Sequence, residues 1–350
     1  MTALVPLGSP AVAYYGQPDN VTSPEPAIEV NAYILPGKGA VNALDETARH
    51  LTYVSVFSYR AGHDGELVAP EGEDAVLEAA RRHGVRPQMV LTNFDGTNFS
   101  SDLGHAIVND PALRTRVIEN TLRVLREKGY HSLNIDFENL PPEDREAYTG
   151  FIGEMTAILH RAGYPLSVAV APKAGDRPDE AWVGFVDYAA LGSIVDRVIV
   201  MTYEWGWIGG PPMPIAPLDK VRGVIEYLVQ HVPPGKILMG MPLYGYDWEL
   251  PDTPANTAKS LDPVRARQLA QRYGARIQWD ERAASPFFYY TDDWDNGHAV
   301  WFEDGWSMAA KYALVREFGL RGVSFWVLGN RFPENWAVLD GLFEPVRDRA

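Results

Sequence analysis

The sequence predicts an α/β fold, a closed (β/α)8 or TIM barrel with a small α+β insertion between strands 7 and 8. Three observations favour it: eight short apolar runs, helical patterns between most of them, and one gap much longer than the rest. Alternating strands and helices imply parallel pairing with right-handed crossovers, and eight such units close a barrel. The eight runs begin at Ile28, Leu51, Pro87, Ser132, Leu166, Arg197, Ile237 and Gly322.

The helical segments between the runs carry apolar residues at helical spacing. Clear examples are EDAVLEAARRHG, which precedes the third run, and REAYTGFIGEMTAILHRAG, which follows the fourth. A doubly wound open sheet is the main alternative to the barrel. No glycine fingerprint of the dinucleotide-binding kind opens any of these segments, so we favour the barrel.

The gap between the seventh and eighth runs is about 75 residues long, against roughly 30 for a βαβ unit. Its aromatic and turn residues predict that 246–305 form an α+β subdomain along one wall of a cleft. Five prolines among small polar residues indicate that 1–27 are linker-like. The barrel itself is expected to span 28–345.

Composition excludes several classes of function. The formal charge of −15, from 46 acidic and 31 basic side chains, would repel a nucleic acid backbone. The chain has no cysteine, and its eight histidines show no metal-binding spacing, so we expect no metal and no cofactor. No apolar run approaches the ~20 residues that a membrane span needs. The segment 1–15 lacks a cationic stretch and does not resemble a signal peptide.

The fourth run ends in the densest set of polar residues. Side chains alternate along a strand, so Asn134, Asp136 and Glu138 are expected on one face, about 7 Å apart. The carboxyl ends of barrel strands form the active sites of such folds. A negative Asp136 beside a desolvated Glu138 should raise the pKa of the glutamate, as a general acid requires. A solvated strand end capped by acids is the alternative interpretation.

The segment HSLNIDFEN resembles the DxxDxDxE signature of glycoside hydrolase family 18, the chitinase family. With the PPEDR that follows, it is most similar to the bacterial spore-cortex-lytic, or peptidoglycan N-acetylglucosaminidase, branch. The resemblance covers roughly 28–345. Supporting strings follow in order: VNAYILPG, FSY, SVAVAPK, VMTYEWG, GMPLYGYDW and VSFWVLG.

The match to the signature is incomplete. His131 and Asn134 stand where the signature has its first two aspartates, whereas Asp136 and Glu138 are retained. Asn134 can donate a hydrogen bond to Asp136 but cannot take up its proton, so the pH profile is expected to differ from that of chitinases.

The resemblance implies a site at the carboxyl ends of the strands. Glu138 would be the general acid and base, Asp136 would orient the substrate acetamide, and Tyr203 would hydrogen-bond it. Trp326 would lie under the sugar at the point of cleavage, where an aromatic ring stacks on C–H groups. The expected catalytic residues are Glu138, Asp136 and Tyr203, and the expected substrate-binding residues are Asn134, Glu204, Trp326, Tyr33, Phe57, Tyr244 and Trp205.

The function implied is that of a retaining glycosidase that cuts β-1,4 bonds after N-acetylglucosamine in peptidoglycan of the spore-cortex type. Catalysis would be substrate-assisted, as family 18 is an exception to the two-carboxylate scheme. The protein would be a monomer that acts on a polysaccharide in the spore, the cell wall or outside the cell. Chitin or N-glycans remain alternative substrates. A non-catalytic lectin-like barrel is the alternative of another class, against which the retained Asp136 and Glu138 argue.

Overall fold

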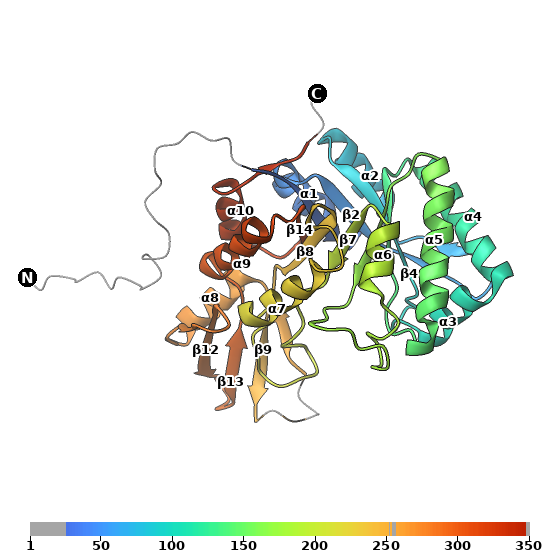
Figure 1. Cartoon of the computed structure of the whole chain (residues 1–350). Helices are drawn as coiled ribbons and strands as arrows, with labels where there is room; N and C mark the ends of the chain where they lie inside the picture. Colours follow the sequence, from blue (N-terminus) through green and yellow to red (C-terminus); the bar gives the residue numbers. More distant parts are fainter. Residues whose placement is uncertain (1–25, 252, 254–256, 348–350) are drawn as a thin grey trace, which may run out of the picture.

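The computed structural model describes residues 26–251, 253 and 257–347, which form a barrel with a second sheet beside it (Figure 1). Eight parallel strands close on themselves, because the first strand pairs with both the second and the last. The predicted fold class is therefore confirmed. Of the segment expected to be a linker, residues 1–25 lie outside the described residues, and Ala27 already opens the first strand.

The barrel strands are short and regular. Two further strands extend the sheet at its rims, β3 (Leu67–Val68) antiparallel to β2 and β15 (Glu344–Pro345) parallel to β1. In order around the barrel the eight strands are β1 (Ala27–Ile34), β2 (Tyr53–Ala61), β4 (Arg86–Thr92), β5 (Ser132–Asp136), β6 (Leu166–Val170), β7 (Arg197–Val200), β8 (Ile237–Pro242) and β14 (Gly322–Trp326).

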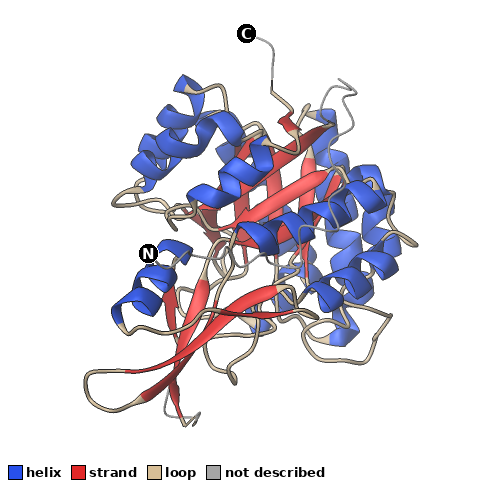
Figure 2. Ribbon diagram, turned by 90° about the vertical axis from the view of Figure 1, so that its left-hand side faces the viewer, coloured by secondary structure: helices blue, strands red, loops and turns tan. Residues whose placement is uncertain are grey.

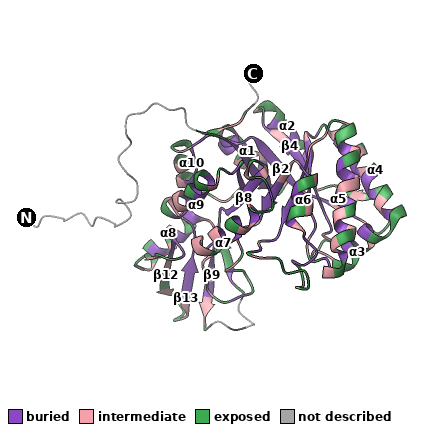
Figure 3. Ribbon diagram, in the orientation of Figure 1, coloured by how far each residue is buried: buried purple, intermediate pink, exposed green. Residues whose placement is uncertain are grey.

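Helices surround the strands, with their inner faces buried and their outer faces exposed (Figures 2 and 3). In the described part of the chain, none of them combines the length and the apolar character that crossing a membrane requires. They are α1 (Ala40–Thr47), α2 (Glu73–Arg82), α3 (Ser101–Asn109), α4 (Pro111–Lys128), α5 (Arg145–Arg161), α6 (Tyr188–Ile194), α7 (Leu218–Leu228), α9 (Gly305–Phe318) and α10 (Pro333–Asp340), with single turns η2 (Ala48–His50), η3 (Pro142–Asp144) and η4 (Pro234–Lys236).

Local sequence signals fix the ends of these helices, as α4 illustrates. The Asp110 carboxylate accepts hydrogen bonds from two backbone N–H groups of the first turn, and Pro111 opens the helix where its missing N–H costs nothing. Gly129 ends it with φ of 68°, a left-handed conformation that glycine adopts without strain. The helix thus stops one turn before β5 begins.

The alternation of β5 divides its side chains between two environments. Ile135 and Phe137 face outward, where Phe137 stacks on Phe151 of α5 with ring centroids 5.5 Å apart. The side chains between them face the barrel interior, which is polar in its middle. A chain of hydrogen bonds crosses five strands there and joins Ser324, Asn31, Ser55, Gln88 and Ser132.

The second sheet lies between β8 and β14 in sequence and beside the barrel in space (Figures 1 and 2). Its five antiparallel strands are covered on one face by α8 (Pro263–Arg272), whose Ala266 and Ala270 pack on Phe288. On its other face Tyr246 and Trp301 pack against the barrel mouth. The strands are β9 (Gly245–Leu250), β10 (Lys259–Leu261), β11 (Gln278–Asp280), β12 (Ser285–Thr291) and β13 (Gly297–Trp301).

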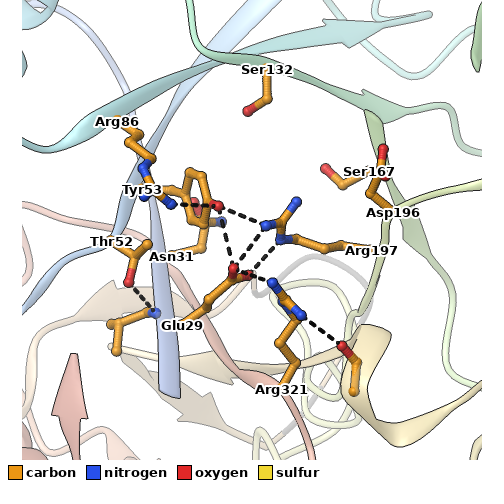
Figure 4. Close-up of polar contacts among 12 residues, drawn as sticks. Glu29, Asn31, Thr52, Tyr53, Arg86, Ser132, Ser167, Asp196, Arg197 and Arg321 are labelled. Carbon is orange, nitrogen blue, oxygen red and sulfur yellow. Dashed lines mark hydrogen bonds and ion pairs between the residues drawn. The ribbon is translucent and has the colours of Figure 1, made fainter. Parts of the chain in front are cut away.

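An ion-pair network closes the opposite, amino-terminal end of the barrel (Figure 4). The Glu29 carboxylate accepts hydrogen bonds from Arg197 at 2.5 and 2.8 Å and from Arg321 at 2.7 Å. Arg197 also donates to the hydroxyl of Tyr53. Burial alone would raise the pKa of Glu29, but the two guanidinium groups lower it to about 2. The network joins β1, β2, β7 and the start of β14.

We predict that this network makes stability depend on pH. The depressed pKa of Glu29 contributes stability that is present above the ordinary glutamate pKa of 4.5 and is lost as the pH falls toward about 2. Denaturant unfolding from pH 5 to pH 2.5 should show that the free energy of unfolding falls more in the wild-type protein than in Glu29→Gln, which lacks this titrating group. At pH 7 the variant should lose about 3–5 kcal/mol, because two arginines lose their partner. Identical pH slopes in the two proteins would contradict the assignment.

Candidate active site

A cavity of about 710 Å³ opens at the carboxyl ends of the barrel strands. The structure brings most of the predicted site residues together in its wall, although they come from five separate strand ends. Asn134 and Tyr244 are not part of the wall. The predicted residues that line the cavity are Tyr33, Phe57, Asp136, Glu138, Tyr203, Glu204, Trp205 and Trp326.

The two acids of β5 lie at the centre of this cavity. Asp136 is the last residue of the strand and is only 4% exposed, and Glu138 follows it at the rim. Within the described residues, the buried Oδ1 atom of Asp136 has no hydrogen-bond partner. A buried carboxylate oxygen without a partner carries the full cost of its desolvation. The site is therefore arranged to receive a donor or a positive charge from a ligand.

Electrostatics keep protons on this pair. Burial raises the pKa of Asp136. Burial also raises the pKa of Glu138, and the negative charges of Asp136 and Glu204 raise it further. Since the two carboxyls interact, they titrate as a pair. Near neutral pH the pair thus holds a proton, and the raised pKa of Glu138 agrees with the shift expected from the sequence.

Two tyrosines hold the side chain of Glu204 in place, Tyr244 directly before β9 and Tyr246 within it. The hydroxyl groups of Tyr244 and Tyr246 both donate to its Oε1, the latter at 2.9 Å. Its backbone lies in the left-handed region, with φ of 66°, where a residue other than glycine is strained. Tyr244, expected to contact substrate, instead lies 4% exposed beneath Glu204 and holds it in place.

Asn134 lies one layer below Asp136 and is completely buried. Its Oδ1 accepts from the Tyr33 hydroxyl at 2.9 Å, and its amide donates to Ser167 Oγ at 3.0 Å. The sequence suggested that Asn134 donates a hydrogen bond to Asp136, and this prediction is wrong. The Tyr33 hydroxyl reaches Asn134 from β1 across the barrel interior, and Ser167 lies on the adjacent strand β6, whereas Asp136 lies about 7 Å further along β5.

Aromatic rings form the floor of the cavity. The half-buried ring of Trp326 lies 5.5 Å from that of Tyr33 and 5.0 Å from that of Phe57, measured between centroids. These contacts fix the indole while leaving part of it accessible. Such a platform suits the apolar face of a sugar ring.

A positioning residue that the sequence did not indicate is Asn93, directly after β4. Its Oδ1 accepts from the backbone N–H of Glu138 at 3.0 Å, and its amide donates to the Glu138 carbonyl at 2.8 Å. The side chain is fully buried and also donates to the Ser100 carbonyl. Asn93 thus continues the β4–β5 pairing beyond the end of β5. No local pattern reveals a contact between residues 45 positions apart.

The cavity also includes aromatic residues outside the predicted set, among them Phe94, Phe99 and Trp182. They lie on loops after β4 and β6, where no periodicity distinguishes a cavity wall from ordinary surface. In the described ranges, no three acidic or histidine side chains gather in a way that could hold a metal ion.

We predict that Glu204→Gln lowers the pKa of Glu138. The charge of Glu204 helps to keep Glu138 protonated, and glutamine removes the charge while still accepting from the two tyrosines. Glu138 should then lose its proton at a lower pH, which an NMR titration of ¹³C-labelled glutamate carboxyls would measure. Glu249→Gln on β9, outside the cavity wall, is the matched control. A higher or unchanged pKa in Glu204→Gln would contradict the prediction.

Comparison with known proteins agrees with this geometry. Residues 50–330 match the model of the glycosyl hydrolases family 18. The chain is 40% identical over 331 residues to the cortical fragment-lytic enzyme of Bacillus subtilis (strain 168), covering 93% of this chain and 77% of that protein.

Two solved structures are similar throughout. The spore cortex-lytic enzyme SleL of Bacillus cereus superposes with a TM-score of 0.90 at 37% identity, over 93% of this chain and 76% of that one. A chitinase from Chromobacterium violaceum ATCC 12472 superposes with a TM-score of 0.83 at 28% identity, over 90% and 98%. The resemblance inferred from the β5 segment is thereby confirmed, and the chain belongs to glycosyl hydrolase family 18 and is a glycoside hydrolase.

Proposed function

We propose that this protein is a retaining N-acetylglucosaminidase that acts on peptidoglycan of the spore-cortex type, as a monomer in the spore or cell wall. The observation that supports the mechanism is the buried pair of Asp136 and Glu138, which lines the cavity with Tyr203 and Trp326. One oxygen of Asp136 has no hydrogen-bond partner among the residues that the structure describes. The names of the Bacillus relatives support the substrate class.

The proposed reaction uses the acetamide of the substrate as the nucleophile. With the sugar on Trp326, Glu138 gives its proton to the glycosidic oxygen as that bond to the anomeric carbon breaks. The acetamide carbonyl oxygen bonds to the same carbon and forms a positively charged oxazolinium ring. Asp136 accepts the acetamide N–H and stabilises the positive charge, and Tyr203 orients the group. Water then gives a proton to Glu138 and opens the ring, which retains the configuration.

Two alternatives compete with this proposal. In the first, Glu204 attacks the sugar and forms a covalent intermediate, as in the two-carboxylate mechanism. Its Oε1 already accepts from two tyrosine hydroxyl groups, which makes it a weaker nucleophile and favours a binding role. In the second, chitin is the substrate, as the similarity to a chitinase would allow. Digestion of cortex, vegetative peptidoglycan and chitin in parallel, with the new ends identified by mass spectrometry, separates these substrates.

We predict different losses for the two acids. Glu138→Gln cannot supply the proton, so kcat should fall by about 100- to 10,000-fold while substrate still binds. Asp136→Asn loses the charge opposite the oxazolinium, so its kcat should fall more than its KM changes. Steady-state kinetics on a soluble peptidoglycan fragment measure both.

The same enzyme should be inhibited by an N-acetylglucosamine thiazoline and should not cut a substrate without the 2-acetamido group. Labelling of Glu204 by a mechanism-based fluorosugar, or cleavage of de-N-acetylated glycan at a similar rate, would refute substrate assistance.

We also predict that Asn93→Ala lowers kcat through the position of Glu138. The variant removes both bonds to the backbone of Glu138, and a displacement of about 1 Å can cost 100-fold in rate. KM should change less, because no substrate contact is lost. Asn335→Ala is the control, since Asn335 is equally buried and pairs with Tyr312 away from the cavity. Both variants should unfold at lower denaturant, but a matching fall of kcat in Asn335→Ala would show that Asn93 acts through stability alone.

A further inference from the structure

We propose that the end of the cavity bordered by Trp182 and Lys220 binds a sugar that bears a carboxylate, next to the N-acetylglucosamine at the cleavage point. This inference rests on the proposed function and specifies its substrate. The carboxylate is that of the 3-O-lactyl substituent of muramic acid, either free or extended by a peptide.

This end of the cavity is built from two neighbouring elements. One is the segment between β6 and α6, which contributes Lys173, Arg177 and Trp182, and the other is α7, which contributes Lys220 and Val224. The two elements are packed together, because a Cβ on Gly223 of α7 would lie 4.0 Å from that of Ala174. Since β6 pairs with β5, this end adjoins Glu138, whereas Trp326 rises from β14 on another side of the mouth. A leaving-group sugar beyond Glu138 therefore has this wall beside it.

Trp182 has the features of a stacking platform. Its indole is 54% exposed and lines the cavity, although its neighbours Val183 and Phe185 are almost fully buried. Its backbone is left-handed, with φ of 59°. The loop is tight at Gly184, where a Cβ would come within 2.5 Å of the Pro178 carbonyl. Holding this tryptophan outward in a strained conformation is unfavourable in the free protein. A sugar ring stacked on the indole would contribute favourable free energy that offsets this cost.

Lys220 provides a free positive charge beside this platform. It is exposed, lines the cavity, and forms no ion pair or side-chain hydrogen bond with any residue that the structure describes. It lies in the first turn of α7, where the helix dipole disfavours a cation, so helix stability does not account for it. Its place one turn before Val224 directs it along the same helix face toward the cavity.

Two further cations lie in this wall, and each already has an acidic partner. Arg177 uses only Nη1 to bind Glu180, which also lines the cavity, so its other N–H groups remain available. The Lys173 side chain is 1% exposed and donates to the Val186 carbonyl at 2.5 Å, with Asp176 further away at 3.4 Å. The chain as a whole has a net charge of −15, and the centre of the cavity carries three carboxyls. Since Arg177 and Lys173 are paired with Glu180 and Asp176, the positive charge in excess at this end is that of Lys220. A cation at one end of an acidic site selects an anionic group at that position.

Carboxylate is the anion that fits a glycan with N-acetylglucosamine at the cleavage point. A homopolymer of N-acetylglucosamine has no such group, and in the lactam form of muramic acid the carboxyl is consumed. The wall would therefore favour a glycan with free or peptide-bearing muramic acid over both of them.

Calorimetric binding to the Glu138→Gln protein tests this without any need for cleavage. The ligands are an alternating N-acetylglucosamine–N-acetylmuramic acid tetrasaccharide, its lactyl methyl amide, its lactyl-alanine form and an N-acetylglucosamine tetramer. Adding Lys220→Glu should weaken the free acid about 10-fold relative to the methyl amide and the tetramer, and added salt should reduce that difference. The lactyl-alanine form shows whether the carboxylate is better placed on the lactyl group or one residue further out.

Lys259→Glu on β10 is the matched control, because it makes the same charge change on an exposed residue outside the cavity wall. It should leave all four affinities unchanged. Trp182→Ala should weaken the acid and the methyl amide alike by about 5- to 10-fold, as loss of a stacking contact would.

Equal weakening of acid and methyl amide by Lys220→Glu, or no weakening of either, would overturn the inference even if the wild-type protein cuts peptidoglycan. Conversely, a wild-type protein that cuts no peptidoglycan but loses its preference for the acid in Lys220→Glu would refute the proposed function and leave the charge selectivity standing.

Discussion

Closure of the parallel sheet, through the pairing of β1 with both β14 and β2, commits every second side chain of eight strands to an interior without bulk water. Each polar group there must find a partner across the barrel. The lower layers do so through the chain from Ser324 to Ser132 and through the bonds of Asn134 to Tyr33 and Ser167. At the mouth this pairing stops, and one oxygen of Asp136 has no hydrogen-bond partner in the part of the chain that the structure describes. The position where closure leaves a polar group unsatisfied is the position where we propose that the substrate binds.

The same interior accounts for the acid chemistry. In a medium of low polarity a second charge beside Asp136 is costly, so burial and the neighbouring carboxylates raise the pKa of Glu138. Glu204 adds to this effect while two tyrosine hydroxyls hold it in place. At the amino-terminal end of the barrel the result is the opposite. Glu29 is also buried there, but two arginines pair with it, lower its pKa and keep it charged. At one end of the barrel the buried carboxylate is paired with cations and stays charged, and at the other the buried carboxyls pair with no cation among the described residues and have raised pKa values.

The sequence predicted the features that depend on residue periodicity and on the order of segments along the chain. The eight runs, the helices between them and the shared face of Asp136 and Glu138 follow from alternation, which the closed barrel preserves. What it could not predict depends on contacts between distant segments. Asn134 bonds to Tyr33 across the barrel and to Ser167 on the adjacent strand instead of to Asp136, Tyr244 holds Glu204, and Asn93 holds the backbone of Glu138. Trp182 lines the cavity from the loop between β6 and α6.

The loops supply specificity because the barrel supplies rigidity. Asn93 extends the β4–β5 ladder by one side chain, so Glu138 stands beyond the strand yet is held as if within it. The β6–α6 segment and α7 lie outside the ladder and can vary without moving the acids. We therefore expect a change at Lys220 to alter which sugar is accepted, and a change at Asn93 to alter how Glu138 delivers its proton. Under the proposed function, separate supports for chemistry and for recognition would allow one barrel to cut different N-acetylglucosamine polymers with the same pair of carboxyls.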